Sequence, residues 1–132
     1  MSNGLPIPKW LTSRVLLWQR RLNLDTWTLV LHLVEGIKEQ PNAGALTSWA
    51  RNYHTAHISF KRSDYDDRTP REMDLTIVHE LYHLLAARED DAVEAMVGSE
   101  GTVYKGYSKE QEHIADAFAA AIVKAYARKR EA

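Results

Sequence analysis

The segment at residues 69–87 carries the strongest folding signal in this chain of 132 residues. Thr69 suits the N-cap of a helix, Pro70 suits the first helical position, and Glu72 completes a capping box three residues after the cap. Apolar residues then recur at helical spacing, at Ile77, Val78, Leu81, Leu84 and Leu85. The sequence therefore predicts a helix with one buried face, which has to pack against the rest of the domain.

The N-terminal part of the chain predicts a helix over residues 1–24 and a sheet over residues 25–61. Apolar residues first lie on one broad helical face and then, from Trp27 onward, alternate along a largely buried strand. Proline, asparagine and glycine mark the connections. The strands are expected at residues 27–34, 45–50 and 55–61, with a loop at residues 36–44 and a turn near Arg51 and Asn52.

The C-terminal part predicts a second long helix at residues 108–129, preceded by a short helix at residues 92–97. Ser108 and Gln111 fit another capping box. The residues expected on the buried face of this helix are Ile114, Phe118, Ile122 and Tyr126. We expect a single α+β domain over residues 1–132, with a small, mostly antiparallel three-stranded sheet packed on an N-terminal helix, the 69–87 helix and the C-terminal helix.

Composition narrows the class of protein. The chain has no cysteine, which excludes disulfides, thiolate metal sites and cysteine nucleophiles. Its net charge of −1 argues against autonomous binding to nucleic acid. There is no apolar run of the roughly 20 residues that a membrane span needs, and the first ten residues lack the pattern of a secretory signal. We therefore expect a cytoplasmic protein without membrane contact, in an oligomeric state that composition does not define.

His79, Glu80 and His83 form the pattern H-E-x-x-H in the middle of the predicted 69–87 helix. Residues four apart are about 40° apart around a helix and one turn along it, so both imidazoles can reach one ion. The pattern is typical of a catalytic zinc site in which the glutamate acts on a water molecule. The alternative is a pair of surface histidines with a solvated glutamate between them.

A zinc ion with an open position for water needs a third protein ligand. The short-spacer arrangement would put glycine at position 86 and histidine at position 89, where this chain has Ala86 and Glu89. The C-terminal helix offers Glu112 and His113, which lie about 100° apart around the helix, so only one of the two can face the metal. Asp116 shares a face with Glu112 and is suited to accept a hydrogen bond from a ligating histidine.

These residues resemble the gluzincin metallopeptidases, over about residues 76–120. H-E-x-x-H is followed by Glu112 and, four residues later, by Asp116, in a motif that ends with Phe118 and Ala119. Within that group, the sequence pattern is similar to that of the ImmA/IrrE-type peptidases, and the chain length is similar to that of the minigluzincins. The resemblance implies a zincin-like fold, Glu112 rather than His113 as the third zinc ligand, and a substrate cleft lined by an edge strand at residues 46–50.

The resulting expectation is a zinc metallopeptidase acting on a protein or peptide, with Zn²⁺ held by His79, His83 and Glu112. Glu80 is the expected general base, which takes a proton from water and passes it to the leaving amine. A second hypothesis is a zinc-binding interaction or regulatory module of the same fold with little turnover, since larger gluzincins supply a further His or Tyr from a C-terminal subdomain. A third is a DNA-associated protein resembling SprT, in which His113 would be the ligand.

Overall fold

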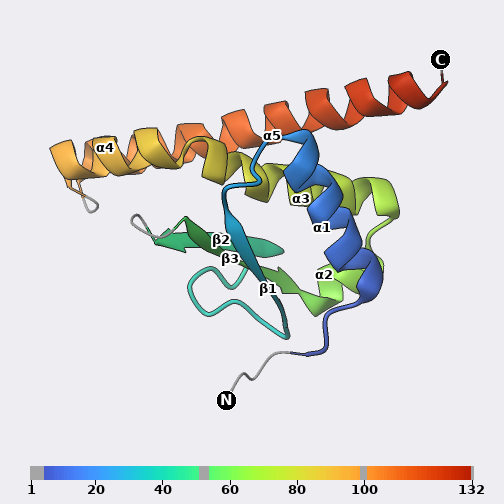
Figure 1. Ribbon diagram of the computed structural model, residues 1–132. Coiled ribbons are helices and arrows are strands. Elements are labelled where there is room, and N and C mark those ends of the chain that lie inside the picture. Colours follow the sequence, from blue (N-terminus) through green and yellow to red (C-terminus); the bar gives the residue numbers. More distant parts are fainter. Residues whose placement is uncertain (1–4, 51–53, 99–100, 132) are drawn as a thin grey trace.

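The computed structural model describes residues 5–50, 54–98 and 101–131, and the predicted turn at residues 51–52 lies outside them (Figure 1). Among the described helices none is long and apolar enough to cross a membrane. The elements in chain order are α1 (Lys9–Arg21), β1 (Thr28–Val34), β2 (Ala45–Ala50), β3 (Thr55–Lys61), α2 (Arg62–Asp67), α3 (Pro70–Leu85), α4 (Ala87–Val97) and α5 (Thr102–Glu131).

The three strands form one mixed sheet in the order β1-β3-β2. β2 runs antiparallel to β3, whereas β1 runs parallel to it, so one of the two pairings departs from the mostly antiparallel arrangement that the sequence predicts. The reason is topological. The chain reverses between β1 and β2 and again between β2 and β3, and β3 then lies between the other two strands in the direction of β1. β2 is consequently left at an edge of the sheet.

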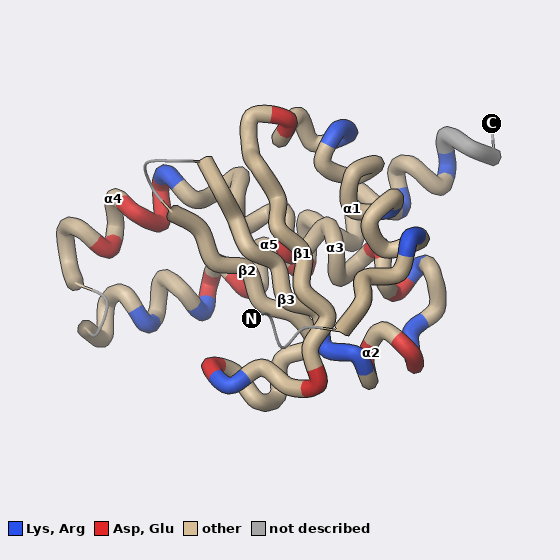
Figure 2. The backbone as a smooth tube through the Cα atoms, turned by 60° about the horizontal axis from the view of Figure 1, so that its bottom comes forward, with Lys and Arg blue, Asp and Glu red and all other residues tan. Residues whose placement is uncertain are grey.

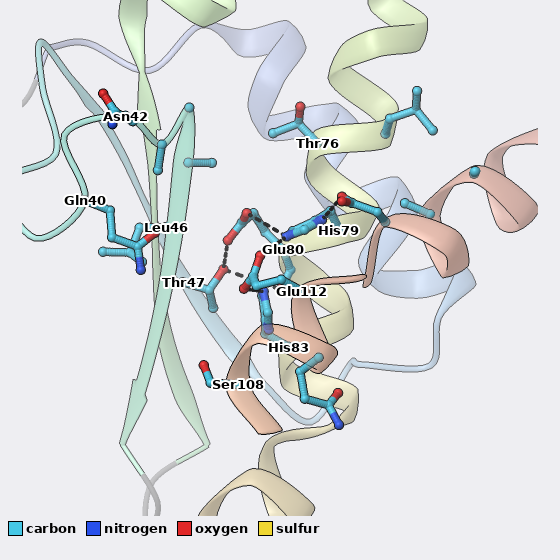
Figure 3. A pocket seen from close by; sticks show the side chains of 18 of the residues that line it. Gln40, Asn42, Leu46, Thr47, Thr76, His79, Glu80, His83, Ser108 and Glu112 are labelled. Atoms are coloured by element: carbon cyan, nitrogen blue, oxygen red, sulfur yellow. Dashed lines mark hydrogen bonds and ion pairs between the residues drawn. The ribbon is translucent and has the colours of Figure 1, made fainter. Parts of the chain in front are cut away.

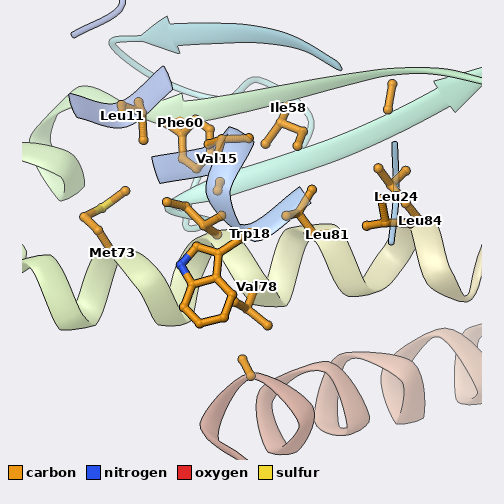
Figure 4. Close-up of a cluster of buried hydrophobic side chains, with 14 of the residues drawn as sticks. Leu11, Val15, Trp18, Leu24, Ile58, Phe60, Met73, Val78, Leu81 and Leu84 are labelled. Carbon is orange, nitrogen blue, oxygen red and sulfur yellow. The ribbon is translucent and has the colours of Figure 1, made fainter. Parts of the chain in front are cut away.

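α3 is the central helix, lying between the sheet and α5 (Figure 1). Its predicted capping box is confirmed: Thr69 Oγ1 accepts from the Glu72 backbone N–H at 3.2 Å, and Glu72 Oε1 accepts from the Thr69 N–H at 2.9 Å. Leu85 is 44% exposed and lies outside the buried stripe. The core beneath α3 is apolar (Figure 4) and includes Leu11, Val15, Trp18, Ile58, Phe60, Met73, Ile77, Val78, Leu81 and Leu84.

A buried polar contact fixes α1 against the first half of α3. The Arg14 guanidinium donates two hydrogen bonds of 2.6 Å to the Asp74 carboxylate, and Trp18 Nε1 donates a third of 2.9 Å. Bidentate arginine–carboxylate contacts are among the stronger and more directional hydrogen bonds in proteins. Since α3 carries the H-E-x-x-H residues, this contact holds the helix of the candidate site in one position.

The helices after the sheet differ from the sequence prediction. α2 occupies residues for which the sequence predicted no element, and α4 is longer than the expected 92–97 helix. α5 begins at Thr102, so Ser108 lies within the helix and is not its cap. Of the residues expected on the buried face of α5, Phe118, Ile122 and Tyr126 pack partly buried against the core, whereas Ile114 is 42% exposed. The fully buried positions of the helix are Gln111, Ala115, Ala119 and Val123. Three of these four are small or β-branched, which lets α5 approach α3 closely.

Candidate metal centre

His79, His83 and Glu112 meet at the contact between α3 and α5 (Figure 3). The two histidines project from successive turns of α3, as the four-residue spacing requires. Glu112 reaches between them from α5. Its Oε2 lies 3.0 Å from His79 Nε2, and its Oε1 lies 3.0 Å from His83 Nε2. One carboxylate therefore bridges both imidazoles.

The three side chains of this cluster could hold a metal ion. One ligand atom from each of the three side chains lies within 4.8 Å of the other two. A zinc ion about 2.0–2.1 Å from each donor places neighbouring donors roughly 3.3 Å apart. Two imidazole nitrogens and one carboxylate oxygen are a common ligand set for catalytic zinc. Among the described residues, this is the group of His, Asp and Glu side chains that could hold a metal ion.

Asp116 supports the cluster from the next turn of α5. Its Oδ1 lies 2.7 Å from His79 Nδ1, the ring nitrogen that faces away from Glu112. A carboxylate at this nitrogen holds the N–H there and leaves Nε2 for a ligand. The predicted contact of Asp116 with a histidine of the cluster is thus present in the structure. His113, the alternative third ligand, is exposed and does not belong to the cluster.

Glu80 lies beside the cluster in a different environment from the other acidic groups. Its side chain is buried, with only 6% of the residue exposed, and its Oε2 lies 3.8 Å from His79 Nε2. Oε1 accepts a hydrogen bond of 2.8 Å from Thr47 Oγ1 on β2. Burial raises the pKa of Glu80, against the opposing influence of the two nearby histidines and Thr47. A carboxyl group with a raised pKa beside a ligand site is suited to exchanging protons near neutral pH.

Without a metal ion, the cluster retains protons. Burial by itself lowers the pKa of His79, but the hydrogen bond to Glu112 and the charge of Glu80 outweigh it and raise the pKa to about 9. The hydrogen bonds from both imidazoles hold the pKa of Glu112 well below its usual range. The metal-free pairing is therefore an imidazolium against a carboxylate.

The cluster opens into a cleft of about 780 Å³ between β2, α3 and α5. Lys61 N donates to Gly44 O at 2.8 Å, so positions 44, 46 and 48 make the hydrogen-bonded pairs with β3. Because such pairs alternate in an antiparallel ladder, the backbone N–H and C=O groups of Ala45, Thr47 and Trp49 point away from β3. No described strand pairs with that edge. The cleft thus has an unpaired strand edge beside Glu80.

Several residues of the cleft escaped the sequence analysis. Thr47 belongs to the edge strand that was expected to line the cleft, but its hydrogen bond to Glu80 was not predicted. Arg68, Thr76 and Asp90 also line the cleft. Nothing in their local sequence separates them from solvated polar residues, because the contacts that define them come from distant elements.

The chain matches no model of a known protein family, no curated protein and no solved structure. Its function therefore has to be argued from the geometry of the cluster and the cleft.

Proposed function

We propose that the protein is a zinc-dependent metalloendopeptidase with a zincin-like fold of the gluzincin type. One observation carries the proposal: Glu112 lies 3.0 Å from an imidazole nitrogen of both His79 and His83, while Glu80 is buried beside them. These four residues thereby divide into two roles. His79, His83 and Glu112 would hold the zinc, and Glu80 remains available for proton transfer.

The reaction proposed is the addition of water across a peptide bond. Bound by this ligand set, zinc would polarise the peptide carbonyl and lower the pKa of a water molecule toward 7. The Glu80 carboxylate takes one proton from the attacking water and gives it to the amine nitrogen as the C–N bond breaks. Thr47 and the burial of Glu80 tune the pKa at which this exchange occurs. Asp116 keeps the His79 ring in the tautomer that offers Nε2.

The substrate proposed is an extended peptide segment lying along β2. The outward backbone groups of Ala45, Thr47 and Trp49 can pair with such a segment as an added strand. Thr47 lies in the middle of these three and contacts Glu80 directly. A peptide paired at Thr47 would therefore present its backbone carbonyl next to the general base.

A comparison of wild type with Glu80→Gln tests this proposal. The substitution keeps the size and polarity of the side chain and removes its basicity. Zinc content should stay the same, while hydrolysis of an unstructured protein such as casein should fall by roughly 10²- to 10⁴-fold. Equal hydrolysis by both proteins would refute Glu80 as the base. Loss of zinc from Glu80→Gln would instead make Glu80 a ligand.

A second candidate function is zinc binding with little turnover. The described lining of the cleft contains no tyrosine and no histidine besides His79 and His83. The further His or Tyr that larger gluzincins supply to the transition state is thus missing from that lining, which favours an interaction or regulatory module. Zinc-loaded wild type that cleaves no member of a diverse peptide library would support this second function over the first.

A further inference from the structure

The cleft carries a positive side chain at one end. Arg68, which precedes α3, donates from Nη1 to Thr76 Oγ1 at 2.7 Å, and its Nη2 lies 3.3 Å from Asp64 Oδ2. Thr76 is one helical turn before His79, so Arg68 marks the part of the cleft that faces the beginning of α3. Held by two partners, the guanidinium still has unused N–H donors and lines the cleft.

Gly44, the residue directly before β2, leaves room for this arrangement. A Cβ atom on Gly44 would collide with the Asp64 carboxylate and lie 3.3 Å from Arg68 Nη2. The absence of a side chain at position 44 therefore lets the Asp64–Arg68 pair sit directly against the strand. Arg68 is in this way held next to the backbone along which a peptide would pair.

The opposite end of the cleft is acidic. Asp90 on α4 lines it, and Tyr104 Oη donates to Asp90 Oδ2 at 3.4 Å. No lysine or arginine in the described part of the chain forms an ion pair with Asp90, and burial raises the pKa of this carboxyl. Trp49 lines the same end and donates from Nε1 to Asp91 Oδ1 at 3.3 Å. Figure 2 shows that acidic residues recur along α4.

Contacts along β2 give the order and spacing of these groups. Gly44 adjoins Arg68, Thr47 contacts Glu80, and Trp49 contacts α4. In Figure 3, Thr76 and Ser108 lie on opposite sides of the histidine cluster, in agreement with this order. At about 3.4 Å per residue of strand, Arg68 is roughly three residues from the reacting position and the acidic end roughly two residues on the other side.

We infer that the cleft selects peptides by charge polarity, accepting an acidic side chain at the Arg68 end and a basic one at the Asp90 end. This inference rests on the proposed binding of a peptide along β2. Arg68 supplies a planar fork that matches a carboxylate. Asp90 supplies a carboxylate that no described lysine or arginine pairs with, and the ring of Trp49 offers a surface for the stem of a lysine or arginine. The two contacts together fix the direction in which the peptide lies.

Peptide binding to the zinc-loaded Glu80→Gln protein tests the inference without turnover. The probes are fluorescein-labelled octapeptides of alanine, serine and one central phenylalanine, which differ only in the second and seventh residues. Five peptides are compared. At the second and seventh positions, respectively, they carry glutamate and lysine, lysine and glutamate, two glutamates, two lysines, or two serines. Fluorescence anisotropy gives the Kd of each. One of the two oppositely charged peptides should bind most tightly, at least about threefold better for each matched charge.

Neutral substitutions assign the two contacts. Arg68→Gln should remove the advantage of glutamate and keep that of lysine, whereas Asp90→Asn should do the reverse. Arg62→Gln and Asp66→Asn neutralise an ion pair of α2 outside the cleft and should change neither. Equal Kd values for the neutral and charged peptides, or preferences that persist in both cleft variants, would overturn the inference. Thermal melts of each variant verify that it is folded.

The two proposals fail separately in this design. If Glu80→Gln binds peptides charge-selectively but wild type cleaves none of them, the proposed hydrolytic function is refuted and the charge polarity of the cleft is supported. If wild type cleaves the peptides but Glu80→Gln binds them without any charge preference, the charge polarity is refuted and the hydrolytic function is supported.

Discussion

Asp116 Oδ1 lies 2.7 Å from His79 Nδ1, on the side of the ring opposite Glu112. Because Glu112 and Asp116 are one turn apart on α5, a single helix face contacts both nitrogens of the same imidazole. The ring is held between two carboxylates, with its orientation set from α5 although it belongs to α3. The two helices thus define the geometry of the cluster jointly.

Removal of the Asp116 carboxylate should weaken zinc binding without abolishing it. We expect Asp116→Ala to lower zinc affinity by roughly 10- to 100-fold, because the tautomer and orientation of His79 are then no longer fixed. Competition with a chromophoric chelator measures the change. Glu110→Ala, an exposed position on the same helix, is the matched control and should bind zinc like wild type. Unchanged affinity in Asp116→Ala would contradict the orienting role.

The third ligand can be identified by paired substitutions of adjacent residues. Glu112→Ala should sharply reduce zinc binding, since it removes the group that lies between both imidazoles. His113→Ala should bind nearly as much zinc as wild type, because His113 lies outside the cluster. Equilibrium dialysis followed by metal analysis compares the two. The opposite ranking would move the protein to the three-histidine class of zinc sites.

Zinc should be present in about one equivalent per chain in protein purified without chelators. His79→Ala and His83→Ala should each lose it, and full occupancy in both variants would refute the site. An ion bound only by the folded state stabilises that state, so free zinc at about 100 times its Kd should add about 2.7 kcal/mol, or roughly 10 °C in melting temperature. Calorimetry before and after addition of a chelator measures this difference.

The pH dependence of stability should differ between the metal-free and zinc-loaded forms. The pKa of His79 rises from 6.5 to about 9 on folding without metal, so its contribution to stability is complete below about pH 6.5 and is lost as the pH rises through about 9. Zinc has to displace that proton, so its affinity rises over the same range. The melting temperature of the metal-free form should fall between pH 6.5 and 9.5, while the increment due to zinc grows. A constant zinc increment across this range would contradict the assignment of the proton to His79.

Local signals in the sequence were enough to predict the elements that carry the cluster. The capping box at Thr69 and Glu72 fixes the start of α3 through hydrogen bonds between near neighbours, and the edge strand was predicted with its observed bounds. The spacing of His79 and His83 places both on one face of α3 because helix geometry is independent of context. These features depend on residues a few positions apart, which is why sequence reasoning reached them.

Features that depend on tertiary packing were not accessible in this way. The parallel pairing of β1 with β3 follows from the path of the chain across the sheet, not from the strand sequences. Ile114 was expected in the core, but the close approach of α5 to α3 is made through Ala115 and Ala119, so the larger side chain points outward. The Arg68 contacts join residues of α2 and α3 with Gly44, directly before β2. Small residues and charged residues carry little local signal for such contacts.

Glu112 bridges the two imidazoles in the position that a metal ion would occupy between the three side chains. Two imidazoles and a carboxylate already lie near the positions that they would take around an ion, held by hydrogen bonds instead of coordination. If the protein binds zinc as proposed, these hydrogen bonds would keep the junction between α3 and α5 closed when the ion leaves, and the ion could return without refolding. Occupancy would then follow the zinc available in the surroundings, and the supply of metal would regulate the protein reversibly.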